Sequence, residues 1–176
     1  MAYSRAGGHA MSKLLAGALV CALIWCMIWG TGCGADPVRA DLEAYQREVL
    51  DPLGREESAG AAELSAALAD LTAGRVDARA AQRVYRDRLA ERYRALAAKL
   101  TAYRAATHEL AQLNARLAGQ YEQVAQELDR AATHLGRDEW SGFAEAHARI
   151  GTGGLESVRS ELTALAAQHG FDLAGK

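Results

Sequence analysis

The feature that most constrains the fold is a long stretch of sequence without helix breakers. Between Ala78 and Leu135 there is no proline and a single glycine, Gly119. Apolar residues recur there at alternating intervals of three and four positions, which is the heptad pattern of a helix with one apolar face. The a positions are Tyr93, Leu100, Thr107, Asn114, Tyr121, Leu128 and Leu135, and the d positions are Leu89, Leu96, Tyr103, Leu110, Leu117, Val124 and Ala131. This pattern predicts one long, coiled-coil-like helix over residues 78–135.

The e positions of the same heptads indicate how this helix packs. Five of the six are alanine, where a two-stranded coiled coil usually carries charges. Alanine widens the apolar face and lets a second helix approach closely, as in a bundle. The body is rich in Ala, Leu, Arg and Glu, and its Val, Ile and Thr residues are too sparse to build a sheet. The predicted fold class is therefore all-α, a helical bundle organised on one long helix.

Capping residues and helix breakers set the ends of the other helices. Asp36 is a good N-cap, and Pro37 fits the first helical position, where its missing N–H costs nothing. Pro52 and Gly54 are predicted to end this first helix, and Gly74 to end the second. The predicted helices cover 37–52, 58–73, 78–135, 138–150 and 153–169, within one domain of residues 36–173.

Two polar residues, Thr107 and Asn114, occupy consecutive a positions of the long heptad pattern. A buried asparagine at such a position usually fixes the register of packed helices at a cost in stability. Together with Gly119, the two residues are also consistent with a bend, or with a polar spot that faces a ligand. Fixing the register is the interpretation that we favour.

The N-terminal segment has the organisation of an export signal. Residues 1–13 carry Arg5 and Lys13 and no acidic residue, and residues 14–29 form an uncharged apolar run. Small residues follow this run, which completes the three-part pattern of a secretory signal. The run has 16 residues, slightly fewer than the roughly 20 that a stable membrane span needs.

The end of this segment, Gly30-Thr31-Gly32-Cys33, resembles the lipobox of bacterial lipoproteins. In that family two small residues precede a cysteine that receives lipid, and Gly30 stands where the family usually has leucine. The resemblance implies a signal peptide over 1–32 and acyl chains such as palmitate on Cys33, with 33–35 as a short tether. Because the residue after the cysteine is Gly34 rather than aspartate, it also implies the outer membrane of the cell envelope, with the body in the periplasm. An uncleaved anchor, cleavage after Ala35 and a buried helix remain alternatives.

The body offers little that points to catalysis. It contains no cysteine after Cys33, no nucleophile motif and no pair of histidines with metal-ligand spacing, so we expect no enzyme activity, metal or cofactor. The adjacent Glu56 and Glu57 are interpreted as partners of a helix N-terminus. The histidines of the body are His108, His134, His147 and His169. We expect them to be structural, with His147 and His169 meeting between the two C-terminal helices.

The most polarised segment is Arg75–Arg104, which holds nine basic residues and three acidic ones. Within it Arg79, Arg83 and Arg86 share one helical face and form a candidate interaction stripe, hereafter the arginine stripe. Such a stripe suits anionic lipid headgroups or an acidic protein. The alternative is a solvated face with local ion pairs, Arg83 with Asp87 and Arg88 with Glu91. Nucleic acid is an unsuitable partner for an exported chain with a net charge of −2.

Together these features predict a lipid-anchored envelope protein with a non-catalytic binding or scaffolding role. Its predicted partners are the membrane, through the lipid anchor, and an envelope protein. Two alternatives stay open. One is a helical bundle that binds a small molecule or cofactor. The other is a peptidoglycan tether resembling murein lipoprotein, because Lys176 is the last residue.

Overall fold

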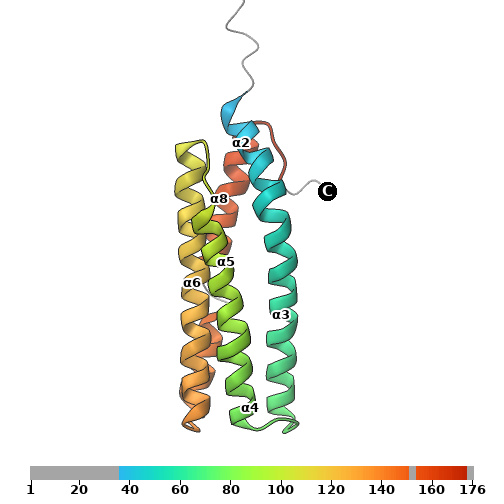
Figure 1. Cartoon of the computed structure of the whole chain (residues 1–176), viewed down its shortest axis with the longest axis vertical. Helices are drawn as coiled ribbons and strands as arrows, with labels where there is room; N and C mark the ends of the chain where they lie inside the picture. Colours follow the sequence, from blue (N-terminus) through green and yellow to red (C-terminus); the bar gives the residue numbers. More distant parts are fainter. Residues whose placement is uncertain (1–35, 151–153, 174–176) are drawn as a thin grey trace, which may run out of the picture. The chain divides into compact units, whose positions relative to one another are not determined.

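The computed structural model describes residues 36–150 and 154–173 (Figure 1). These residues form a bundle of four helices and contain no strand, which confirms the predicted all-α class. None of the helices in these ranges has the length and hydrophobicity that spanning a bilayer requires. The predicted signal peptide and lipidation at Cys33 lie outside the described residues.

The first helix of the bundle is continuous from Pro37 to Thr72, through α2 (Pro37–Tyr45), the π-helical turn η1 (Gln46–Leu50) and α3 (Asp51–Thr72). Its predicted start is confirmed, since the Asp36 carboxylate accepts hydrogen bonds from the N–H groups of Val38 and Arg39.

The predicted end of this helix at Pro52 and Gly54 is wrong. The Asp51 N–H bonds to the Gln46 carbonyl, five residues back, so the backbone is already widened where Pro52 lacks a donor. Leu53 is buried in the core, and its packing favours continuing the helix.

The second and third helices replace the predicted single helix over 78–135, which is wrong. The second helix consists of α4 (Ala78–Arg83), the π-helical η2 (Val84–Ala90) and α5 (Glu91–Ala102). The chain then turns over residues 103–107 and returns as α6 (His108–Gly136), which lies beside α5 (Figure 1). The heptad pattern therefore spans an antiparallel helical hairpin.

Buried polar contacts hold this turn. The Asp41 carboxylate accepts hydrogen bonds from the Thr107 N–H at 2.8 Å and from the Thr107 hydroxyl at 2.7 Å. The Asn114 amide nitrogen donates to the Leu100 carbonyl at 2.7 Å, and its oxygen accepts from the Tyr45 hydroxyl at 2.9 Å. Thr107 and Asn114 thus anchor a turn between two helices, and the interpretation that they set the register of one long helix is wrong.

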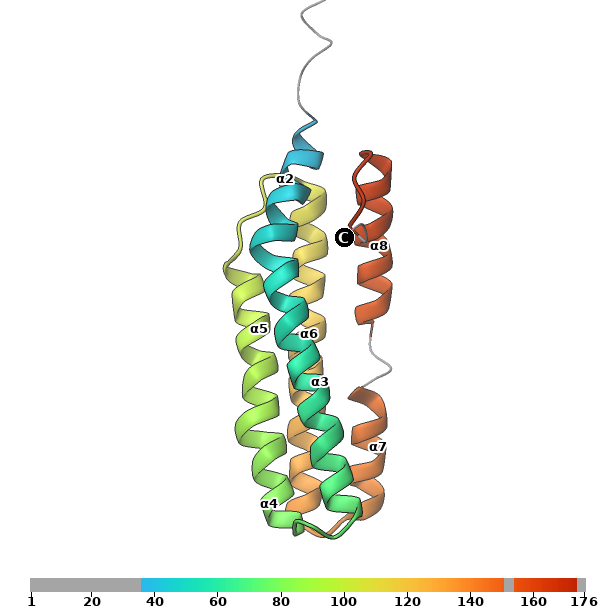
Figure 2. The same ribbon diagram turned by 90° about the vertical axis from the view of Figure 1, so that its right-hand side faces the viewer.

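The fourth helix is in two pieces, α7 (Trp140–Ile150) and α8 (Leu155–Gln168), close to the predicted 138–150 and 153–169. Figure 2 shows the two pieces following one another along α6. The helix α6 packs against α2, α4, η2, α5, α7 and α8. Its e-position alanines Ala118, Ala125 and Ala132 are buried, as expected for a helix with neighbours on more than one side.

Candidate functional site

Two cavities lie between α3 and α8, and we call them together the α3–α8 cleft. The larger has a volume of about 500 Å³ and the smaller about 370 Å³. The apolar lining of the larger cavity comes from Ala61, Leu64, Val124, Ile150 and Leu155. The apolar lining of the smaller one comes from Leu50, Leu53, Leu117, Leu162 and Leu173. Glu57, Ser58 and Arg159 line both cavities, so these polar side chains lie where the two meet.

An ion pair crosses the cleft between these cavities. The Arg159 Nη2 group donates to the Glu57 carboxylate from α8 to α3, and it also lies 3.4 Å from the Tyr121 hydroxyl oxygen. The side chain of Glu57 is only 20% exposed. Burial raises the pKa of the fully buried Tyr121, and the Glu57 carboxylate raises it further. Tyr121 therefore keeps its proton at neutral pH.

Tyr93 is the second tyrosine of the cleft. Its ring stacks on that of Tyr121, with centroids 6.0 Å apart and planes 25° from parallel. Tyr93 is 6% exposed and lines the larger cavity, yet its hydroxyl makes no hydrogen bond to any described residue. Burial, followed by the charge of Glu57, raises the pKa of Tyr93. A neutral hydroxyl without a protein partner thus adjoins the ion pair.

Few polar contacts join α8 to α3 across the cleft. Across the parts of α3 and α8 that the structure describes, the Glu57–Arg159 pair is the only polar contact between the two helices. Other polar contacts tie α8 elsewhere. Arg116 of α6 binds Glu161 through two hydrogen bonds of 2.5 and 2.6 Å, and His169 lies 2.7 Å from the Asp36 carboxylate.

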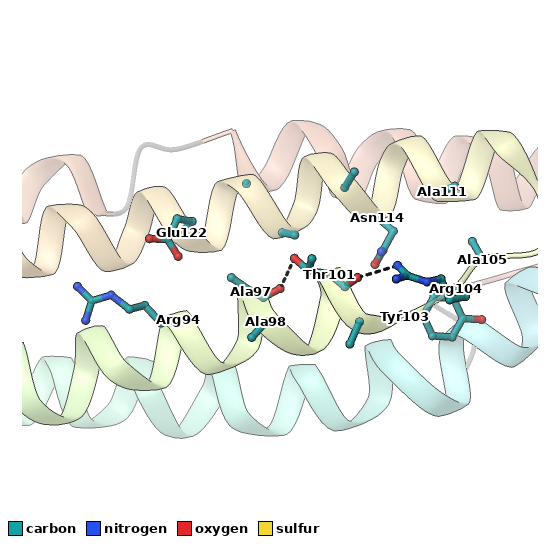
Figure 3. A pocket seen from close by; sticks show the side chains of 14 residues that line it. Arg94, Ala97, Ala98, Thr101, Tyr103, Arg104, Ala105, Ala111, Asn114 and Glu122 are labelled. Atoms are coloured by element: carbon teal, nitrogen blue, oxygen red, sulfur yellow. Dashed lines mark hydrogen bonds between the residues drawn. The ribbon is translucent and has the colours of Figure 1, made fainter.

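A third hollow lies on the outer side of the α5–α6 hairpin and has a volume of about 820 Å³ (Figure 3). Half of its lining residues are alanine: Ala97, Ala98, Ala102, Ala105, Ala111, Ala115 and Ala118. In Figure 3, Arg94 and Glu122 lie toward one end of the hollow and Arg104 toward the other. The amide of Asn114 also lines it, but that amide is already bonded on both sides. The hollow therefore combines small apolar side chains with charged groups at its two ends.

The residues of the arginine stripe are brought together on one segment, since α4 carries Arg79 and Arg83 and η2 carries Arg86. All three are exposed, and Arg86 donates to the Thr133 hydroxyl at 3.3 Å. Arg83 forms no ion pair with Asp87 within the described residues. The stripe therefore remains a basic, solvent-facing surface.

The other predicted local pair, Arg88 with Glu91, is also wrong. Arg88 instead reaches Glu63 of α3 at 2.7 Å, and Glu91 binds Arg94 at 2.5 Å. Arg94 in addition pairs with Asp129 of α6. Arg88 and Arg94, which follow the stripe along the chain, are thus engaged between helices.

The expected meeting of His147 and His169 between the two C-terminal helices is wrong. The His147 Nδ1 atom lies 3.1 Å from the Tyr85 hydroxyl, beside the ring of Phe143, and burial lowers the pKa of His147. His169 pairs with Asp36 instead. In the parts of the chain that the structure describes, no group of His, Cys, Asp and Glu could hold a metal ion.

Sequence reasoning missed the cleft because its polar groups come from distant parts of the chain. The heptad pattern identifies Tyr93 and Tyr121 only as apolar a positions. The predicted helix N-terminus beside Glu57 does not exist, because α3 runs through this position. Arg159 lies 102 residues away from Glu57, and no local pattern links the two.

No protein-family model matches this chain. Comparison with curated proteins and comparison with solved structures also found no match. The residues themselves must therefore support any functional assignment.

Proposed function

We propose that the chain is a lipid-anchored protein of the bacterial cell envelope, with a non-catalytic binding or scaffolding role. The observation that carries this proposal is the order of two features. The export-signal pattern ends at Thr31-Gly32-Cys33, and a capped helical body begins directly afterwards at Asp36. Residues 36–176 form a compact unit of their own, so cleavage before Cys33 removes no residue from that unit. Two or three acyl chains on one cysteine are enough for stable anchoring.

The binding role is proposed for the arginine stripe. The first helix places Asp36 at one end of the bundle and the turn to α4 at the other (Figure 1). Its 36 residues span roughly 50 Å at 1.5 Å per residue. Arg79 and Arg83 thus stand far from the point where the tether joins the body, well beyond a Debye length of about 8 Å at physiological ionic strength. An exposed basic stripe of this kind suits an acidic envelope protein.

Replacing the candidate acylation site tests the anchor. We expect Cys33→Ala to lose metabolic labelling with a fatty acid and to leave the membrane fraction, because a single myristoyl-like chain or none gives only weak membrane binding. Cys26→Ala is the matched control, since no small residues precede Cys26, and it should keep both the label and the location. If Cys33→Ala stays labelled in the membrane, the anchor proposal is wrong.

Charge reversal tests the stripe. Crosslinking in native envelopes should lose a specific adduct when Arg79, Arg83 and Arg86 are changed to glutamate. The matched control reverses three exposed arginines outside the stripe: Arg47, Arg55 and Arg137. An adduct pattern that responds equally to both sets of changes would remove the stripe from the proposed function.

A further inference from the structure

The α3–α8 cleft has the size and construction of a small-molecule site. Ligand pockets usually measure roughly 300–1,000 Å³ and combine apolar walls with a few convergent polar groups. The larger cavity, of about 500 Å³, combines leucine, valine and isoleucine side chains with Glu57, Tyr93 and Arg159. The hollow beside α5 is larger, but its two arginines already bond to described residues, Arg94 to Glu91 and Asp129 and Arg104 to the Thr101 carbonyl. The cleft is thus the described cavity best suited to a specific ligand.

Two polar side chains of the cleft, Arg159 and Tyr93, have hydrogen-bond donors that no described residue accepts. A guanidinium has five N–H donors. Arg159 bonds to described residues through Nη2 alone, which leaves its Nη1 and Nε groups without a protein acceptor. The hydroxyl of Tyr93 lines the larger cavity and also makes no hydrogen bond to a described residue. These donors line an open cavity, where a bound acceptor can take the place of water.

The charges that line the cleft limit what this acceptor can be. Glu57 is already paired with Arg159 and interacts with the Tyr121 hydroxyl, and Glu156, the second acid lining the larger cavity, is exposed. Arg159 is the only cation among the described residues that line the larger cavity. A carboxylate matches the planar guanidinium through two parallel hydrogen bonds, and it can accept a third from a neighbouring hydroxyl.

The walls indicate what the carboxylate is attached to. Leu64, Val124, Ile150 and Leu155 line the larger cavity beside the polar groups, so a ligand that reaches Arg159 lies against apolar side chains. An unbranched alkyl chain gains free energy from each methylene that leaves water, about 0.8 kcal/mol per CH₂. The Glu57–Arg159 pair is the only described polar contact between α3 and α8, so a ligand that enters between them has one such contact to open.

We propose that the α3–α8 cleft binds a single-chain amphiphile with a carboxylate headgroup. The carboxylate accepts hydrogen bonds from Arg159 and from the Tyr93 hydroxyl, and the alkyl chain lies in the larger cavity. Glu57 competes with the ligand for Arg159, which makes the ion pair a reversible closure of the cleft. This binding does not depend on the lipid anchor, since every residue involved belongs to the helical body.

Calorimetric titration with decanoate tests the proposal. The full chain is held in nanodiscs, and the heat with empty nanodiscs is subtracted. We expect saturable binding of one decanoate per chain, and roughly tenfold or greater weakening for Arg159→Met, the loss expected when a charged hydrogen-bonding group is removed. Tyr93→Phe should weaken binding several-fold. Glu57→Gln should bind decanoate at least as tightly as the original chain, because a competitor for Arg159 has been removed.

Matched controls separate binding from folding. Arg116→Met removes the other arginine that pairs with α8 but lies outside the cleft, and it should bind decanoate normally. Ala61→Trp fills the larger cavity from an exposed helix position and should abolish binding, whereas the neighbouring Ala62→Trp should not. Circular dichroism checks the helical content of each variant, and Arg159→Lys should restore part of the affinity if Arg159→Met folds poorly.

Several outcomes would overturn the proposal. One is that decyltrimethylammonium binds as tightly as decanoate. Another is that Arg159→Met and Arg116→Met have the same affinity for decanoate. The third is that Glu57→Gln binds decanoate more weakly than the original chain. Decanoate binding by Cys33→Ala in buffer should equal that of the original chain. Loss of membrane attachment and loss of ligand binding can therefore be told apart.

Discussion

Replacing Asn114 with leucine should destabilise the protein, because both ends of this side chain are used inside the core. The Asn114 oxygen accepts from the Tyr45 hydroxyl, and its nitrogen donates to the Leu100 carbonyl in the last turn of α5. Asn114 is 5% exposed, and Tyr45 and Leu100 are fully buried. The substitution leaves a hydroxyl and a carbonyl without partners and releases one of the contacts that hold the turn.

The magnitude follows from these two orphaned groups. Each buried polar group that loses its partner costs about 1–3 kcal/mol. Burying a leucine side chain stabilises the fold by at most about 1.5–3 kcal/mol. The net gain is smaller, because the apolar part of the asparagine side chain is already buried. We therefore expect the free energy of unfolding to fall by about 2–4 kcal/mol.

The sign of this effect distinguishes the hairpin from one continuous coiled-coil helix. In a coiled coil a polar residue at an a position lowers stability, so Asn114→Leu would stabilise the assembly. In the hairpin the same change removes a turn contact and destabilises it. The measurement is urea unfolding of the full chain in mild detergent, followed by circular dichroism.

Two further variants complete this test. Gln123→Leu, an exposed position on the same helix, is the control and should change stability by less than about 0.5 kcal/mol. Tyr45→Phe combined with Asn114→Leu should cost less than the sum of the single changes, because Tyr45→Phe removes one orphaned group. A variant Asn114→Leu that is as stable as the original chain would refute the reasoning.

Three other predictions concern the core and the titrating groups. Leu128→Ala, at a fully buried position of α6, should lower the free energy of unfolding by about 2–5 kcal/mol in the same urea assay. Burial lowers the pKa of His147 from its ordinary 6.5. The stabilisation by neutral His147 is therefore complete above pH 6.5 and is lost as pH falls through the lower pKa of the folded state. NMR titration of His147 checks the pKa, and the free energy of unfolding of His147→Gln should depend less on pH in this range. The hydrogen bond from His169 lowers the pKa of Asp36 from 3.8, so this pair stabilises the fold above that value and the effect disappears as pH falls below it. Asp36→Asn still caps α2 and should remove this loss of stability at acid pH. An unchanged dependence of the free energy of unfolding on pH would contradict the assignment.

The helical content and the buried face of α6 could be predicted from the sequence, whereas the turn at 103–107 could not. The a and d positions of α6, and its e positions Ala118, Ala125 and Ala132, lie in the core because packed helices bury heptad positions whichever helix lies beside them. The turn contains neither glycine nor proline, so rules based on helix breakers find no signal in it. The polar a positions Thr107 and Asn114 are the local sign of this turn, and Asp41, the partner of Thr107, lies 66 residues from it.

The predicted helix end at Pro52 is wrong for the opposite reason, because here a helix-breaking signal is present but the fold accommodates it. A proline and a nearby glycine usually end a helix, but a single π-helical turn accommodates the missing donor, and burial of Leu53 keeps the helix together. The cleft could not be predicted from the sequence because it depends on how the helices pack. It exists because α8 follows α7 along α6, and this arrangement sets Arg159 opposite Glu57.

The lipid-anchored role is tested most directly by the intact mass of the chain purified from its native envelope. The proposal predicts a chain that begins at Cys33 and carries the additional mass of two or three acyl chains. A chain that still begins at Met1, or one that begins after Cys33 without lipid, would contradict it.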